Sequence, residues 1–300
     1  MTLQPNAPES NEPGPREPGP NVLAGIGDEA AVELTGQLAA LDRLGWSAVE
    51  LRTVDGRALA DLDDEHFAQV RAQVERAGLQ VVGLASRIGN WARPITAPLD
   101  DDLRELEVLA ARGAELGCRA LRVMSYPNDG LAEPEWQRRV LDRMRRLAAR
   151  AAELDVVLLH ENCAGWAGSD ADRMLRLVEE CGPSLRLLFD TGNGIEHGYD
   201  AADLLAGILP HVAHVHVKDA VGDADDATYV LPGSGRAGVP ECLRMLRESG
   251  YTGPLSIEPH LSARPHDGIS AGESAAERFV QAGRILERLL TQAALVGEPA

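Results

Sequence analysis

The sequence lacks several features that would place it in a specialised class of protein. It contains no run of about 18 apolar residues, so we expect no transmembrane helix. Its N-terminus has no charged region followed by an apolar run, which argues against a secretory signal. Its cysteines are few and form no C-x-x-C pair, so we expect free thiols in a protein of the reducing cytoplasm. The four are Cys118, Cys163, Cys181 and Cys242.

Basic residues are also scarce beside acidic ones. The chain has 29 Lys and Arg against 47 Asp and Glu, a net charge of -18. Nucleic-acid binding gains its affinity from Lys and Arg that neutralise phosphates, so we expect no nucleic-acid partner. The expected partner is a small molecule.

The composition divides the chain into a short tail and one long domain. Residues 1–20, MTLQPNAPESNEPGPREPGP, hold six prolines and no apolar periodicity. Such a segment cannot bury an apolar face, so we expect a disordered tail. The remaining residues, 21–300, fit one α/β barrel, and a hydrophobic content of 44% is enough for a large core.

Short apolar runs rich in Val, Leu and Ile alternate with longer stretches of helical period. Eight strands, each followed by a helix, predict a closed parallel (β/α)8 TIM barrel. The alternative is an open doubly wound sheet, but no G-x-G-x-x-G follows the first strand. The predicted strands are Val22–Ile26, Ala48–Leu51, Gln80–Leu84, Ala120–Met124, Val156–Glu161, Leu185–Asp190, Val212–Val217 and Leu255–Glu258.

Glycines mark the ends of several predicted helices. Periodic leucines predict a helix from Asp28 to Leu44, and Gly45 supplies the left-handed residue of its C-cap. Gly78 and Gly117 end two further helices in the same way. We expect Ser169 to be an N-cap.

Carboxylate and imidazole side chains close four consecutive predicted strands. The active site of a TIM barrel lies at the C-terminal ends of its strands, so these side chains should meet. Buried carboxylates on one rim repel one another unless a cation joins them. Three carboxylates and one imidazole favour Mn²⁺ or Mg²⁺, with Co²⁺ or Zn²⁺ as further options. The predicted metal ligands are Glu161, Asp190, His216 and Glu258.

Other residues near this rim are candidates for substrate contact. Amide, carboxylate and cationic groups can bind hydroxyls, and tryptophans can form an apolar wall against a sugar, although packing between loops explains a tryptophan equally well. The glycine-rich turn at 233–236 is weak evidence for phosphate binding. The predicted substrate-binding residues are Glu50, Trp91, Trp166, Asn193, Lys218 and Arg236.

The remaining histidines divide into buried and rim positions. His214 shares a strand face with His216 one layer deeper, and we expect a hydrogen-bonded core residue there. His197, His260 and His266 fall in rim loops, where they could touch substrate.

Four motifs in this order and spacing resemble the sugar phosphate isomerase/epimerase family of the xylose isomerase-like TIM barrel superfamily. They are Leu-Leu-Phe-Asp190-Thr-Gly-Asn, His-Val-His216-Val-Lys-Asp219, Pro-Gly-Ser-Gly-Arg and Gly-Tyr-Thr-Gly-Pro-Leu-Ser-Ile-Glu258. The resemblance implies the same four metal ligands, with Glu161 and Glu258 as an acid/base pair beside the substrate. Members often pair, so a homodimer is an open alternative to a monomer.

The chain departs from the ketohexose epimerases of this superfamily at two positions. Asn193 stands where they carry a histidine, and Lys218 is the nearest cation to the place of their substrate-binding arginine.

The sequence therefore predicts a divalent-metal-dependent sugar or sugar phosphate isomerase or epimerase. Proton abstraction beside a carbonyl would proceed through a metal-bound enediolate. The alternatives are a lyase like inosose dehydratase, which would expel hydroxide instead, and a barrel that binds a ligand without catalysis. A DNA-repair nuclease would need more rim histidines and a basic surface.

Overall fold

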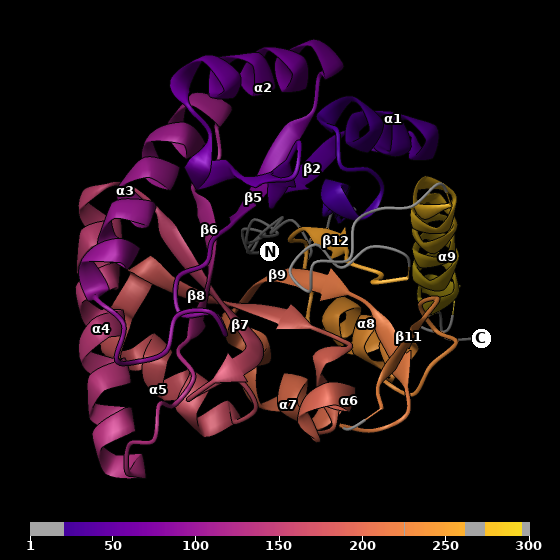
Figure 1. The fold of residues 1–300 in the computed structure, drawn as a ribbon. Coiled ribbons are helices and arrows are strands. Elements are labelled where there is room, and N and C mark those ends of the chain that lie inside the picture. The colour runs from indigo at the N-terminus through magenta and orange to yellow at the C-terminus, as the bar shows by residue number, and fades with distance from the viewer. Residues whose placement is uncertain (1–20, 225, 262–273, 296–300) are drawn as a thin grey trace, which may run out of the picture.

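Eight parallel strands form one sheet in the computed structural model, which describes residues 21–224, 226–261 and 274–295 (Figure 1). The strand order is β1-β12-β9-β8-β7-β6-β5-β2, and a bridge between Ile26 and Glu50 joins β1 to β2. The sheet is therefore a nearly closed barrel, which confirms the predicted (β/α)8 fold. Its strands are β1 (Leu23–Gly25), β2 (Ala48–Leu51), β5 (Gln80–Ala85), β6 (Ala120–Ser125), β7 (Val157–Gly165), β8 (Leu185–Asp190), β9 (Val212–Val217) and β12 (Leu255–Ile257).

Helices surround the sheet on its outer side (Figure 1). Two short hairpins add to the loops at its rim: β3 (Thr53–Val54) with β4 (Arg57–Ala58), and β10 (Asp219–Val221) with β11 (Thr228–Val230). The described α-helices are α1 (Leu34–Leu44), α2 (Asp64–Ala77), α3 (Leu99–Leu116), α4 (Glu133–Glu153), α5 (Ala171–Cys181), α6 (Asn193–His197), α7 (Ala201–Ile208), α8 (Val239–Glu248) and α9 (Ala275–Leu295).

The strands are apolar on both faces because both faces are covered. In β8 every residue except Arg186 is buried, with side chains facing either the barrel interior or the helices. This is the expected pattern for parallel sheets and explains the near-continuous apolar runs in the sequence. A carboxylate at the end of such a strand therefore starts from a buried position.

The predicted helix ends agree at the C-termini and differ at some N-termini. Gly45 ends α1 with φ of 68°, as predicted. However, α1 begins at Leu34 rather than Asp28, because the preceding residues form a short 3-10 helix, η1 (Gly27–Glu29), whose side chains enter buried ion pairs. The N-cap prediction at Ser169 is wrong by one residue: the carboxylate of Asp170 accepts the hydrogen bond that caps α5.

Across the described part of the chain, no helix has the length and apolar character needed to span a bilayer. The predicted tail at 1–20 and the rim histidine His266 lie outside the described residues, so both stay predictions.

Candidate functional site

The four predicted metal ligands meet at the C-terminal ends of neighbouring strands. Asp190 on β8 is in register with His216 on β9, Glu161 is on β7, and Glu258 directly follows β12. One ligand atom from each of the four lies within 4.8 Å of the others. From His216 Nδ1 the distances are 3.4 Å to Glu161 Oε1, 3.9 Å to Asp190 Oδ2 and 3.5 Å to Glu258 Oε2. All four side chains are buried.

Two polar atoms at the centre of this group have no hydrogen-bond partner. They are Asp190 Oδ2 and His216 Nδ1. The other carboxylate oxygen of Asp190 accepts hydrogen bonds from the amides of Gly192 and Asn193, both at 2.8 Å. Buried polar atoms normally have hydrogen bonds, so two possible ligand atoms that lack them and face one point fit a divalent cation, even though Lys218 forms an ion pair with Asp190 Oδ2.

The charge balance of the group supports the same interpretation. Burial raises the pKa of Asp190 to about 7, and repulsion from Glu258 and Glu161 acts in the same direction against the attraction of Lys218. A carboxylate at this position is therefore costly to ionise without a further positive charge. Oxygen donors with one imidazole nitrogen suit Mn²⁺ or Mg²⁺, so the residues present fit a divalent cation.

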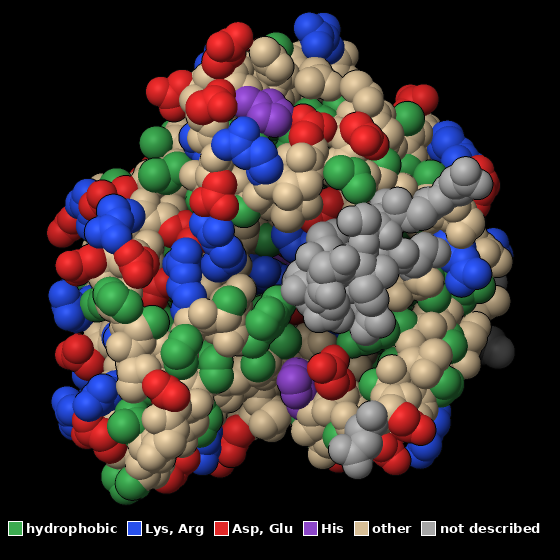
Figure 2. Space-filling model, in the orientation of Figure 1, with side chains coloured by type: hydrophobic (Ala, Val, Ile, Leu, Met, Phe, Trp, Pro, Cys, Tyr) green, Lys and Arg blue, Asp and Glu red, His purple; other side chains and the backbone are tan. Residues whose placement is uncertain are grey.

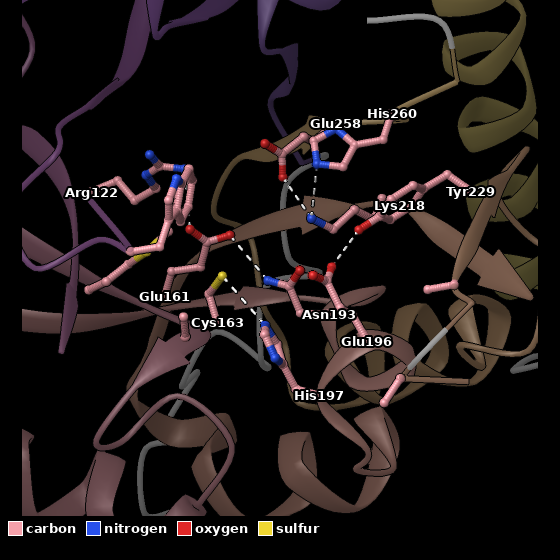
Figure 3. A pocket seen from close by; sticks show the side chains of 15 residues that line it. Arg122, Glu161, Cys163, Asn193, Glu196, His197, Lys218, Tyr229, Glu258 and His260 are labelled. Carbon is pink, nitrogen blue, oxygen red and sulfur yellow. Dashed lines mark hydrogen bonds and ion pairs between the residues drawn. The ribbon is translucent and has the colours of Figure 1, made fainter. Parts of the chain in front are cut away.

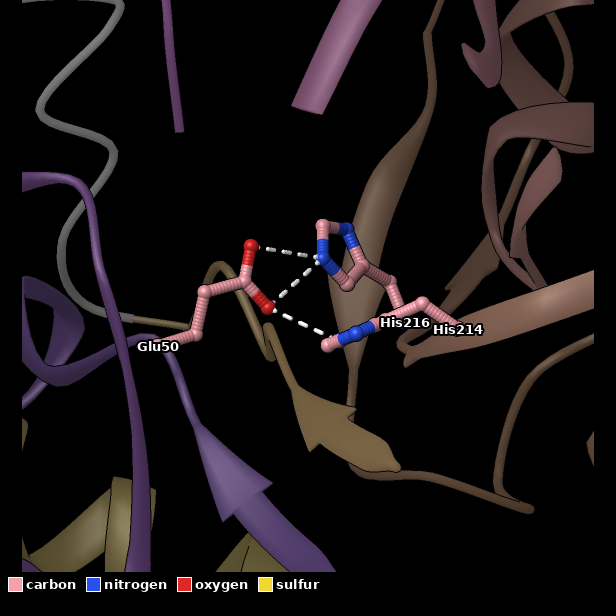
Figure 4. Close-up of side chains that lie close together, drawn as sticks. All are labelled: Glu50, His214 and His216. Carbon is pink, nitrogen blue, oxygen red and sulfur yellow. Dashed lines mark hydrogen bonds and ion pairs between the residues drawn. The ribbon is translucent and has the colours of Figure 1, made fainter. Parts of the chain in front are cut away.

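The carboxylate of Glu50 points toward the imidazole rings of His216 and His214 (Figure 4). Its carboxylate oxygens are 3.1 and 3.0 Å from His216 Nε2, and 3.0 Å separates Glu50 Oε2 from His214 Nε2. A carboxylate on one ring nitrogen orients the imidazole and turns the other nitrogen to the metal. Glu50 is not among the described residues that line the cavity, so its place in the structure fits an orienting position better than the predicted substrate contact.

His214 occupies the core position that the sequence predicts. Its Nε2 is 2.8 Å from the hydroxyl of Ser256, and its ring packs edge-on against His216.

Two buried arginines hold the glutamates of the group. Arg52 Nη1 is 2.5 Å from Glu258 Oε1, and Arg122 Nη1 is 3.3 Å from Glu161 Oε2. Burial alone would raise the pKa of Glu161, but Arg122 and His216 lower it to about 2. The pKa of Glu258 is likewise held well below its usual range, against burial, by Lys218 and His260. Both glutamates are therefore ionised at neutral pH.

A cavity of about 340 Å³ opens onto this group. Figure 2 shows a hollow near the centre of this face, with Lys and Arg side chains at one side of it. Figure 3 shows how Glu161, Glu258 and Lys218 point into the cavity from different strands. A cavity of this size is at the lower end of the range for small-molecule sites. Its lining includes Trp91, Arg122, Met124, Glu161, Cys163, Ala164, Asn193, Glu196, His197, Lys218, Ala224, Ala227, Tyr229, Glu258 and His260.

Comparison with known proteins agrees with this architecture. The family model described as the xylose isomerase-like TIM barrel matches residues 38–278. The chain belongs to this family. The chain is 26% identical over 267 residues to an inosose dehydratase of Geobacillus kaustophilus (strain HTA426). The match covers 79% of this chain and 82% of that protein.

Solved structures of similar fold include two with informative ligands. A D-allulose 3-epimerase from Methylomonas sp., solved with D-allulose, has a TM-score of 0.70 and 15% identity, and the match covers 90% of this chain and 98% of that one. A xylose isomerase-like TIM barrel protein from Mycobacterium smegmatis, solved with magnesium, has a TM-score of 0.67 and 16% identity, with coverage of 91% and 97%. At these identities the likeness shows the fold alone.

Three of the substrate-binding residues that the sequence predicts line the cavity. Trp91 is 41% exposed, while Asn193 and Lys218 are buried at its inner end. Lys218 Nζ is 3.2 Å from Asp190 Oδ2 and 3.1 Å from Glu258 Oε2. The lysine thus pairs with the same oxygens that face the proposed cation.

Two other predicted contacts are placed away from the cavity. Trp166 is buried and donates its indole N–H to Glu133, and Arg236 is an exposed residue that is not among the described lining residues. For Trp166 the alternative of packing between loops is therefore the better interpretation.

The glycine-rich turn next to Arg236 has a structural explanation. The carboxylate of Asp219 accepts hydrogen bonds from the backbone amides of Gly233, Gly235 and Ala237. The backbone amides of the turn therefore bind a carboxylate of the same chain instead of a phosphate.

Sequence reasoning missed how η1 supports the site. The Glu29 carboxylate accepts the backbone N–H of His260 at 2.7 Å and lies 2.6 Å from its Nδ1. His260 has a φ of 52°, which is unusual for a residue other than glycine. The ring therefore faces the cavity beside Lys218, with Nε2 and Nζ 3.5 Å apart (Figure 3). The only sequence signal for this was a histidine shortly after a strand end.

Proposed function

We propose that the protein is a divalent-metal-dependent isomerase or epimerase that removes the proton beside a carbonyl of a sugar or sugar-like polyol. The observation that carries this proposal is the convergence of Glu161, Asp190, His216 and Glu258 on one point at the inner end of a small cavity. Mn²⁺ and Mg²⁺ are the favoured ions because three of the four donors are carboxylate oxygens.

The chain's own residues supply the remaining parts of the reaction. The divalent cation, when bound, polarises the substrate carbonyl and makes the neighbouring proton more acidic. Glu161 and Glu258, held in their ionised forms, remove and return protons. Asn193 and Lys218 offer hydrogen-bond donors to substrate oxygens.

The placement of the two glutamates supports epimerisation or isomerisation. Glu161 on β7 and Glu258 after β12 are separated in the sheet by β8 and β9, so they approach the cavity from different sides. One glutamate can then remove the proton, and the other, once it has taken a proton from solvent, can deliver that proton to the opposite face of the same carbon. Alternatively the first glutamate returns the proton it removed to the neighbouring carbon, which gives isomerisation.

Elimination of water is the second candidate. It is supported by the sequence similarity to an inosose dehydratase and by the buried Lys218 and His260 beside Glu258, which can donate a proton to a departing hydroxyl. Both candidate reactions begin with removal of the proton beside the carbonyl. In isomerisation or epimerisation a proton is then returned to carbon, whereas in elimination a proton is donated to the departing hydroxyl.

A metal-supplemented screen of ketoses and inososes in deuterated water tests the proposal. Deuterium at the carbon beside the carbonyl is the expected result, and product absorbance of an enone or diketone would identify elimination. Failure of every Mn²⁺- or Mg²⁺-loaded sample to exchange that proton, together with normal metal binding, would favour the non-catalytic alternative.

Replacement of Glu161 by Gln tests whether this residue takes part in turnover. The amide keeps the side-chain shape but cannot act as a base, so we expect turnover to fall by about 10²- to 10⁴-fold. Glu179→Gln, on the exposed face of α5, is the matched control and should retain full turnover. Steady-state rates measured on the best substrate of the screen are the readout, and equal rates for both variants would contradict the role of Glu161.

Location and quaternary state remain predictions from the sequence. A cytoplasmic location is supported by the four cysteines, which are all free thiols. The family resemblance leaves a homodimer open as an alternative to a monomer, and sedimentation analysis is its direct test.

A further inference from the structure

The two carboxylate oxygens of Glu258 have different partners. Oε1 accepts a hydrogen bond from Arg52 Nη1 at 2.5 Å. Oε2 faces the proposed cation, 3.5 Å from His216 Nδ1, and pairs with Lys218 Nζ at 3.1 Å (Figure 3). One oxygen is thus held away from the cation position while the other is turned toward it.

Arg52 is itself fixed by residues of η1. Its Nε is 3.2 and 3.1 Å from the two carboxylate oxygens of Asp28, and its Nη2 is 2.8 Å from Asp28 Oδ1. Asp28 is held in turn by the backbone N–H and the hydroxyl of Thr53, at 3.0 and 2.7 Å. A planar guanidinium that forms a fork with one carboxylate has little freedom to rotate, so Nη1 has a fixed direction.

This arrangement is buried, which makes its geometry costly to change. The side chain of Arg52 is 8% exposed and those of Asp28 and Glu258 are 1% and 3% exposed. If Glu258 turned both oxygens inward, Arg52 would lose the partner of Nη1 in a place that water does not reach. Asp28 and Glu29 would still balance the charge of Arg52, but a buried N–H donor left without an acceptor is unfavourable, so this contact favours the observed orientation of Glu258.

Glu161 shows the same division of its oxygens. Arg122 Nη1 lies 3.3 Å from Oε2, and Arg122 Nη2 donates to the carbonyl of Ser86 at 3.2 Å. Oε1 lies 3.4 Å from His216 Nδ1. Because Arg122 also lines the cavity and can touch substrate, Arg52 is the clearer case.

The number of oxygens that each glutamate offers decides how many coordination positions stay open. A carboxylate can bind a cation with one oxygen or with both. With one atom from each of four ligands, an ion that prefers about six ligands keeps about two positions for substrate. A glutamate that bound with both oxygens would occupy one of these two.

We propose that Arg52, oriented by Asp28, is a positioning residue that restricts Glu258 to one ligating oxygen and so keeps a coordination position open for substrate. This inference rests on the proposed function, because the cation is the one proposed above.

The test uses Mn²⁺ bound to the full-length protein and counts its bound waters by water-proton relaxation. Arg52→Met keeps much of the apolar stem but removes the donor that holds Glu258 Oε1. We expect the count to fall from about two waters to about one, because Glu258 gains a second ligating oxygen. Mn²⁺ should bind at least as tightly, since a positive charge is lost and an oxygen is gained, while turnover should fall by about 10- to 100-fold.

Arg93→Met is the matched control. Arg93 also pairs with two buried carboxylates, those of Asp102 and Glu105, but it is not among the described residues that line the cavity. It should lose comparable stability to urea and keep the wild-type number of bound waters. A merely structural role for Arg52 predicts that both variants behave alike.

Arg52→Lys keeps the charge and carries the test if Arg52→Met does not fold. A lysine ammonium has no fork to hold Asp28 and Glu258 together, so the water count should again fall below that of the wild type. An unchanged count in a folded Arg52 variant overturns the inference. If the wild type binds Mn²⁺ and the count changes as expected without any substrate turning over, the proposed function fails and the inference stands. If the wild type does not bind Mn²⁺, both fail.

Discussion

At the scale of single residues, the site depends on groups that orient the proposed metal ligands through hydrogen bonds. His216 can present Nδ1 to a cation because Glu50 holds Nε2, with both groups fully buried. Asp190 presents one oxygen because two backbone amides hold the other. The proposed ligands are thus oriented before any ion binds, which reduces the free-energy cost of binding.

Glu50→Gln tests this support of the histidine. The amide is weaker as an acceptor and can present its NH₂ group to His216 Nε2, which leaves the ring poorly oriented. We expect Mn²⁺ affinity to fall by about 10- to 100-fold, measured by calorimetric titration. Glu75→Gln, at an exposed position on α2, should leave affinity unchanged. Wild-type affinity for the Glu50 variant would mean that the histidine is oriented by other contacts.

At the scale of elements, the loops at the C-terminal ends of the strands are held by backbone hydrogen bonds to buried carboxylates. The loop after β11 is fixed by Asp219 at the start of β10, which brings the turn at 233–237 against the barrel. A side chain on Gly235 would meet Asp219 Oδ1 at 2.2 Å, so the close approach requires a glycine there. The glycine-rich turn thus serves the packing of this loop.

Asp219→Ala should therefore loosen this loop. The carboxylate also accepts the amide of Ala220, and removing it leaves several partly buried N–H groups without an acceptor. We expect the free energy of unfolding to fall by about 2 kcal/mol or more in urea titrations. Amide hydrogen exchange at 233–237 should quicken, and exchange as slow as in the wild type would show that other contacts hold the loop.

At the scale of the whole molecule, a concentration of buried negative charge at one end of the barrel links metal binding to stability and pH. Burial raises the pKa of Asp190 to about 7, above the value expected for an unfolded chain. Against burial, Glu50 and the nearby carboxylates raise the pKa of His216 well above its usual range. The metal-free folded protein therefore binds more protons than the unfolded chain, and these groups stabilise it less as the pH rises through about 7.

A divalent cation should reverse this trend, because it replaces the protons on Asp190 and His216. We expect Mn²⁺ at about 100 times its dissociation constant to add about 2.7 kcal/mol to the free energy of unfolding. At one fixed Mn²⁺ concentration, the gain should be larger at pH 8 than at pH 5.5. Urea unfolding with Mn²⁺ and with EDTA at both values is the measurement. Asp190→Asn should lose most of the response, and a gain that did not depend on pH would contradict the assignment of these protons.

The sequence by itself determined the barrel and the four residues at its centre. Apolar runs and glycine-terminated helices are local patterns, and Glu161, Asp190, His216 and Glu258 stand at strand ends, which parallel pairing brings to one rim. Only the tertiary structure decided which residues support them. Arg52 and Glu258 are 206 positions apart, and Glu29 and His260 are 231 apart. These pairs meet because β1 lies between β2 and β12 when the barrel closes, and no local pattern in the sequence encodes that contact.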